Sequence, residues 1–135
     1  MRPPEWHMER AYRRLAAARS LARDGFVEDA FSRLYYAAME AAHTALTSLN
    51  IDPPKKHSAL RGAFRNHVIV PGRIPKTIGI TLDHMESVRL GADYRGLEPA
   101  APDFERAKEN VEALVEAVRD EFLGEFSPAP LGSDE

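Results

Sequence analysis

The sequence predicts an all-α protein, an up-and-down bundle of four main helices plus one short helix. Three observations indicate this fold class: apolar residues recur every three or four positions in several long segments, turn signals separate these segments, and no segment alternates apolar and polar residues as a strand does. Short connections between consecutive helices favour antiparallel neighbours. We therefore expect one helical domain over residues 1–126 and a disordered tail, punctuated by Pro and Gly, over residues 127–135.

The segment Asp29–Leu49 is the most apolar of the chain and predicts the central helix. Its apolar stripe contains Ala30, Phe31, Leu34, Ala37, Ala38, Ala41, Ala45 and Leu49. A line of polar residues at the same helical spacing accompanies it, made of Asp29, Arg33, Tyr36, Glu40, His43 and Thr47. Buried polar groups need partners, so this polar line either faces a groove or is neutralised inside the bundle. Both alternatives stay open at this point.

Turn and capping signals place the helices on either side of this segment. A first helix begins near Pro4, because proline is tolerated in a first turn, and it ends at Asp24-Gly25. The two prolines of IDPPKK end the central helix, and a shorter third helix begins at His57 or Ser58.

Two further helices follow the Pro-Gly turn of VIVPGRIP. The fourth helix runs from about Pro75 to Tyr94. Arg89 falls on its apolar line, where an arginine must reach a carboxylate or a phosphate or extend its stem to solvent. The last helix begins near Asp103, a good N-cap residue, and its apolar face continues to Phe122.

Composition excludes several classes of protein. The chain has no cysteine, so it has neither disulfides nor thiolate metal sites. It also has no run of about eighteen apolar residues, and MRPPEWHMER lacks the apolar segment of a signal peptide. We therefore expect a cytoplasmic protein without a membrane segment.

The net charge of −3 hides an uneven distribution of charge. Between Pro53 and Leu82 there are six basic residues and no acidic residue, whereas from Glu98 onward eleven acidic residues face three basic ones. This asymmetry predicts one face suited to phosphates and another suited to a basic partner or to solubility.

One spacing suggests a metal site but does not complete it. Glu40-x-x-His43 is typical of one helix of a di-iron carboxylate bundle, which needs a second such pair and two more glutamates. The fourth helix offers only Asp83, His84 and Glu86, which do not reproduce the set. We therefore predict no metal and no cofactor.

Several blocks resemble the prokaryotic HEPN domains, the higher eukaryote and prokaryote nucleotide-binding helical domains. Residues 29–38, DAFSRLYYAA, are similar to the DA-x-SR-x-YYA signature of this family. The later blocks agree in order: Lys56-His57-Ser58, Arg73-Ile74-Pro75 and Arg89-x-x-Ala92-Asp93-Tyr94. Together the blocks cover roughly Met8 to Phe122.

The resemblance implies a helical bundle that pairs as a homodimer and is encoded beside a minimal nucleotidyltransferase. In such pairs the HEPN protein acts as a metal-independent ribonuclease toxin and its partner as the antitoxin. The family's nuclease motif is Arg, four to six residues, then His, in which the arginine holds phosphate and the histidine helps activate the ribose 2′-hydroxyl. In this chain four residues separate Arg89 from position 94, where the motif would have its histidine, and that position is Tyr94. The resemblance therefore favours binding over catalysis.

We therefore predict a protein that binds nucleotide or RNA phosphates, as one component of a toxin–antitoxin-like pair. The predicted ligand-binding residues are Arg33, Tyr36, Glu40, Lys56, His57, Arg89, Asp93 and Tyr94. Arg33 should pair with a carboxylate, with Asp29, Glu40 or Asp93 as candidates. Two alternatives stay open: a non-catalytic interaction module, and a metal-independent ribonuclease with a non-standard site in which Arg89 and Tyr94 are the catalytic candidates.

Overall fold

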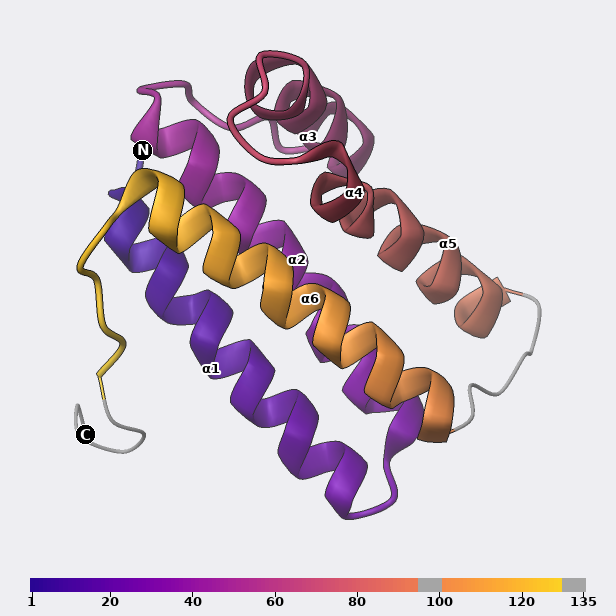
Figure 1. Ribbon diagram of the computed structural model, residues 1–135. Helices are drawn as coiled ribbons and strands as arrows, with labels where there is room; N and C mark the ends of the chain where they lie inside the picture. Colours follow the sequence, from indigo (N-terminus) through magenta and orange to yellow (C-terminus); the bar gives the residue numbers. More distant parts are fainter. Residues whose placement is uncertain (95–100, 130–135) are drawn as a thin grey trace.

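The computed structural model describes residues 1–94 and 101–129, and within these ranges all side chains except those of 89–94, 101 and 102. The described residues form helices and no strand, which confirms the predicted all-α class (Figure 1). In chain order the elements are α1 (Pro4–Arg23), α2 (Val27–Ser48), α3 (His57–Phe64), the π-helical turn η1 (Arg65–Ile69), α4 (Lys76–Gly79), α5 (Thr81–Tyr94) and α6 (Ala101–Phe122).

Helices α1 and α2 form an antiparallel hairpin. The turn between them contains Gly25 at φ +90°, a conformation that glycine adopts without the steric cost other residues would meet. In Figure 1 α6 runs alongside this hairpin, and α3, α4 and α5 lie on the other side of α2. Helix α2 packs against α1, α6, α5 and α3, so it is the central helix that its apolar stripe predicts.

The core lies around α2. Its largest side chains include Leu34, Tyr35 and Leu46 of α2, which pack with Met8 of α1 and Leu114 of α6, and all five are essentially inaccessible to solvent. Burying a side chain of this size stabilises a protein by about 1.5–3 kcal/mol. This packing fixes the helix pair that carries the polar residues described below.

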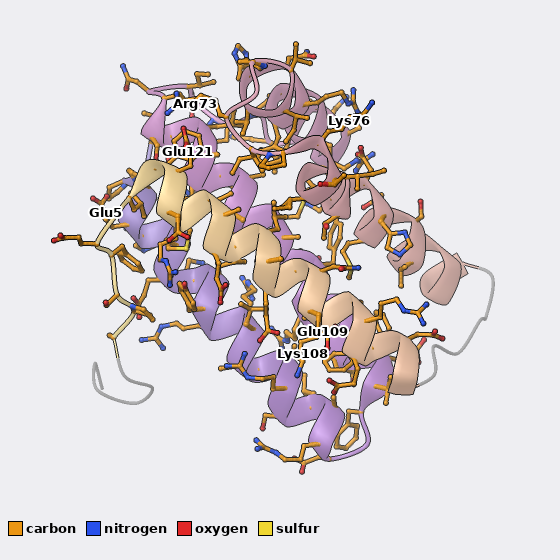
Figure 2. The ribbon with its side chains drawn as sticks, in the orientation of Figure 1. Glu5, Arg73, Lys76, Lys108, Glu109 and Glu121 are labelled. Atoms are coloured by element: carbon orange, nitrogen blue, oxygen red, sulfur yellow. The ribbon has the colours of Figure 1, made fainter. Side chains whose placement is uncertain are left out.

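The segment from α3 to α5 differs from the sequence prediction. The expected fourth helix is divided at Ile80 into α4 and α5, and α3 continues into a π-helical turn whose Val70 N–H donates to the carbonyl of Arg65. The loop before α4 is tied to α6 by an ion pair of 2.7 Å between Arg73 and Glu121 (Figure 2).

Two further findings concern the segment after α6 and the character of the helices. After α6 the backbone N–H of Ala129 donates to the Glu9 carboxylate of α1 at 3.1 Å, and residues 130–135 of the expected tail lie outside the described residues. In the described part of the chain no helix has the length and apolar character needed to cross a membrane.

Candidate functional site

The antiparallel alignment of α1 and α2 brings polar side chains of the two helices together. Residue numbers rise along α1 while they fall along the facing part of α2. His7 therefore meets Glu40, and Arg14, farther along α1, meets Tyr36, which comes earlier in α2. Arg10 and Arg14 are four residues apart, so they lie on the same face of α1.

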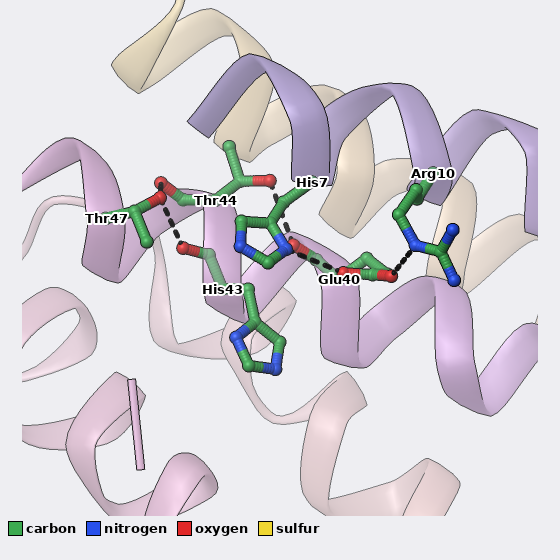
Figure 3. A network of polar contacts seen from close by, with 6 residues as sticks. All are labelled: His7, Arg10, Glu40, His43, Thr44 and Thr47. Carbon is green, nitrogen blue, oxygen red and sulfur yellow. Dashed lines mark hydrogen bonds and ion pairs between the residues drawn. The ribbon is translucent and has the colours of Figure 1, made fainter. Parts of the chain in front are cut away.

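Glu40 is the centre of a buried polar network (Figure 3). Its Oε1 accepts a hydrogen bond from Nδ1 of His7 and its Oε2 accepts one from Nε of Arg10, both at 2.8 Å, although only 9% of the residue is exposed. Burial alone would raise the pKa of the Glu40 carboxyl, but the hydrogen bonds from His7 and Arg10 outweigh burial and leave this pKa below its usual value. Glu40 is therefore ionised at neutral pH and neutralises part of the positive charge of α1.

His43 extends the network by stacking. Its ring lies 4.8 Å from the ring of His7, centroid to centroid, with 12° between the planes. Burial, and then the nearby His7, lower the pKa of His43, while Glu40 opposes the shift. The side chain is therefore neutral at pH 7. The hydroxyl of Thr47 donates to the backbone carbonyl of His43, whereas the buried Nδ1 of the His43 ring has no hydrogen-bond partner among the described residues.

A hollow of about 240 Å³ opens at the other end of the polar line. It is lined by Arg10, Arg13, Arg14, Ala17 and Arg33, and no acidic side chain of the described residues lines it. Burial and then the neighbouring Arg10 lower the pKa of Arg14, with a smaller effect from Arg33. The buried Nε of Arg14 has no hydrogen-bond partner among the described residues. Like charges gathered in this way favour a multivalent anion, because each guanidinium forms charge-assisted hydrogen bonds to phosphate oxygens.

An aromatic group borders this hollow. The guanidinium carbon of Arg14 lies 5.5 Å from the ring centroid of Tyr36, and the ring of His57, from the start of α3, lies 6.4 Å from the same centroid. His57 is held in turn by a hydrogen bond of 2.8 Å between its Nδ1 and the hydroxyl of buried Tyr35. An aromatic group therefore lies next to the cationic hollow, on the side of Arg14.

Comparison with known proteins decides the family. A model of the HEPN domain matches residues 4–121. The chain belongs to the HEPN domain family. The chain is also similar to the UPF0332 protein glr0978 of Gloeobacter violaceus (strain ATCC 29082 / PCC 7421), with 37% identity over 89 residues, 66% of this chain and 70% of that protein. The resemblance seen in the sequence is thereby confirmed.

The HEPN bundle brings together four of the predicted ligand-binding residues, Arg33, Tyr36, Glu40 and His57, around the α1–α2 interface. Lys56 directly precedes α3 and is exposed. The other three, Arg89, Asp93 and Tyr94, belong to the last turns of α5, and their side chains lie outside the described residues.

The expected partner of Arg33 needs correction. Arg33 is exposed, and it makes no ion pair with Asp29 or Glu40. Glu40 is unavailable to it because both carboxylate oxygens are bonded to α1. The third candidate, Asp93, has a side chain outside the described residues. In the described residues Arg33 therefore contributes charge to the hollow without a carboxylate partner.

The polar line of α2 faces a groove at one end and is packed inside the bundle at the other, so each of the two alternatives holds for part of it. Asp29, Arg33 and Tyr36 are exposed, whereas Glu40 and Thr47 are buried and bonded. The glutamate of Glu40-x-x-His43 is thus engaged with α1. Among the described residues no group of three or more His, Asp or Glu side chains is placed to hold a metal ion.

Sequence reasoning missed the arginines that α1 contributes. The signal was present, because Arg10, Arg13 and Arg14 follow one another at spacings of three and one, which places them on neighbouring positions of one helix surface. That they line one hollow becomes visible only when α1 is aligned with α2, since Arg33 then completes the lining.

Proposed function

We propose that this HEPN protein binds phosphate groups of nucleotides or RNA in the hollow between α1 and α2. The observation that supports this proposal most is the lining itself, four arginines with no acidic side chain of the described residues among them. Arginine suits this task because its planar guanidinium donates two parallel hydrogen bonds to a phosphate. The carboxylate of Glu40, which lies near the hollow, is already bonded to His7 and Arg10.

Binding through phosphate contacts predicts a strong dependence on salt. Each neutralised phosphate contributes about −0.7 to the slope of log affinity against log salt for a single strand. A ligand that engages most of the four arginines should therefore give a slope of about −2 to −3.

Fluorescence anisotropy of a labelled RNA, measured between about 50 and about 200 mM salt, tests the proposal. Arg14→Gln and Arg33→Gln should each weaken binding several-fold and reduce the slope. Arg106→Gln is the matched control, since Arg106 is an exposed arginine of α6 that does not line the hollow. If RNA does not bind at low salt, or if all three variants bind like the wild type, the proposal is wrong.

Little or no cleavage should accompany binding. Tyr94 stands where the family motif has its histidine, and tyrosine, with an ordinary pKa of about 10, is a poor general base at neutral pH. Gel analysis of the same RNA samples checks this expectation. Cleavage that Arg89→Ala abolishes would instead support the ribonuclease alternative.

The proposal includes a place in a toxin–antitoxin-like pair with a minimal nucleotidyltransferase. Membership of the HEPN family supports this role. Co-expression with a nucleotidyltransferase encoded beside the gene, followed by co-purification, tests it. A nucleotidyltransferase that does not co-purify with the protein would remove the support for the pair.

A second candidate function is a non-catalytic interaction module. The observation that favours it is the internal packing of half of the polar line: Glu40 and Thr47 are hydrogen-bonded inside the bundle, and His43 stacks on His7. This function predicts co-purification with the partner and no binding of RNA at any salt concentration.

A further inference from the structure

Tyr36 is unusual for a large aromatic residue of the central helix, because 39% of it is exposed. Its ring lies beside the arginine-lined hollow, since Arg14 both lines the hollow and places its guanidinium 5.5 Å from the ring centroid. A phosphate in the hollow would therefore have an accessible aromatic surface next to it.

The ring of Tyr36 is held in place by its neighbours. Tyr35 packs against it at 5.3 Å with 70° between the planes, and His57 packs at 6.4 Å with 77° between the planes. Both contacts are edge-to-face, and a hydrogen bond between Tyr35 and Nδ1 of His57 fixes the two neighbours to each other. A ring that is already positioned loses little conformational entropy when a ligand packs on it.

From this geometry we infer that the site takes a phosphate together with an unpaired base, which packs on the surface formed by Arg14, Tyr36 and His57. The inference rests on the proposed phosphate binding and specifies its ligand as single-stranded RNA or a free nucleotide. Duplex RNA does not fit, because its bases are paired and stacked and expose no face to an aromatic side chain. Bare phosphate leaves the aromatic surface unused.

The arrangement of charge supports the same ligand. Arg10, Arg13, Arg14 and Arg33 converge on one hollow, whereas the backbone of a duplex needs cations distributed along two strands. Arginine beside an exposed aromatic ring is the combination by which proteins hold single strands without reading sequence. His57 adds to it, since Nδ1 is bonded to Tyr35 and Nε2 remains for a base or a ribose.

Competition experiments with the wild-type protein test the inference without any variant. Three unlabelled RNAs of one length displace a labelled single strand: the same single strand, that strand annealed to its complement, and a strand with abasic positions. We expect the duplex and the abasic strand to bind about 5- to 150-fold more weakly, the range that base stacking on one aromatic side chain contributes. A mononucleotide as a fourth competitor distinguishes a free nucleotide from a strand as the preferred ligand.

Variants then assign the effect to the ring. Tyr36→Leu should remove the preference for unpaired bases, while Tyr36→Phe should keep it, because stacking does not need the hydroxyl group. Phe26→Leu is the matched control, since Phe26 is 55% exposed and precedes α2 at the opposite end of the hairpin from the Glu40 network.

The outcomes separate this inference from the proposed function. If no RNA binds at low salt, phosphate binding itself is wrong. If the single strand, the duplex and the abasic strand bind equally and Tyr36→Leu changes nothing, phosphate binding stands and the base-stacking inference is overturned.

Discussion

At the scale of single residues, Glu40 determines how much positive charge the α1–α2 interface presents. It bonds to Arg10 and to His7, and it leaves Arg14 and Arg33 of the hollow without a carboxylate partner among the described residues. One glutamate thus has two effects: it stabilises the helix pair, and it limits the charge available to an anion.

Replacing Glu40 should therefore change stability and binding in opposite directions. Glu40→Gln is expected to lower the free energy of unfolding by about 1.5–3 kcal/mol, because hydrogen bonds to charged groups contribute this much. The same variant should bind RNA more tightly, since Arg10 loses its counter-charge. Urea denaturation and anisotropy measure the two effects, with exposed Glu109→Gln as the control. Unfolding free energies within about 0.5 kcal/mol of each other would show that the network is not stabilising.

His43 makes stability depend on pH. The pKa of His43 is lowered in the folded protein by burial and by His7, so the unfolded chain takes up a proton first as the pH falls through the ordinary value of 6.5. The contribution of neutral His43 to the free energy of unfolding is therefore fully present above that pH. It is lost as the pH falls toward the folded pKa of His43. The lowered pKa of Glu40 gives a second loss of the same sign below its ordinary value of 4.5.

His43→Gln should consequently lose less stability than the wild type between about pH 7 and about pH 5. Urea midpoints at the two pH values measure the difference. Exposed His67→Gln serves as the control and should keep the dependence of the wild type. An unchanged dependence in His43→Gln would assign the loss to other groups.

The sequence revealed one side of the site and not the other. Tyr36 and Glu40 were predictable because they follow the helical period of a single apolar segment. Arg10, Arg13 and Arg14 were not, since the spacing within α1 does not specify which residues of α2 they face. That register is set by packing of the whole hairpin, which no local pattern encodes.

At the scale of elements, local signals predicted where helices begin but not where they break. The starts of α1 at Pro4 and of α3 at His57 agree with the capping and proline signals of the sequence. The break between α4 and α5 coincides with a tertiary contact instead. Gly79, the last residue of α4, lies directly against the side chain of Ile69 in η1, so close that an added Cβ would overlap it.

Gly79→Ala should therefore destabilise the protein by about 1–3 kcal/mol, the usual cost of overpacking. Thermal or urea denaturation measures the change. Gly62→Ala is a matched control inside α3, where an added Cβ meets no atom within 4 Å. It should be neutral or slightly stabilising, because alanine loses less conformational entropy than glycine in a helix. Combining Gly79→Ala with Ile69→Ala should recover part of the loss, and an absence of recovery would mean that this contact does not explain it.

At the scale of the whole molecule, the fold rearranges the charge pattern of the sequence. The basic stretch from Pro53 to Leu82 contains no acidic residue, yet folding supplies carboxylates to it. Arg61 pairs with Asp83 at 3.3 Å, and Arg73 pairs with Glu121 at 2.7 Å. Part of the charge that suggested a phosphate-binding face is therefore neutralised by α5 and α6. The hollow between α1 and α2 is lined by no acidic side chain of the described residues, although one of its arginines, Arg10, is bonded to Glu40.

The last prediction concerns the number of chains that the site needs. The family resemblance predicts a homodimer with Arg89 and Tyr94 near the two-fold axis, a site that both copies would share. The hollow, by contrast, is assembled from α1 and α2 of one chain. We therefore expect a dimer at micromolar concentration by light scattering, and an RNA affinity per chain that does not change when dilution separates the dimers. Arg89→Ala should leave this affinity unchanged, whereas Arg14→Gln should reduce it.

Each alternative result identifies a different error. A monodisperse monomer that binds RNA would overturn the predicted dimer and leave the α1–α2 site intact. Binding that disappears on dilution, in step with dissociation of the dimer, would mean that a shared surface holds the phosphate. Arg89→Ala would then weaken binding more than Arg14→Gln does, because the residues of α5 rather than those of the hollow would contact the RNA.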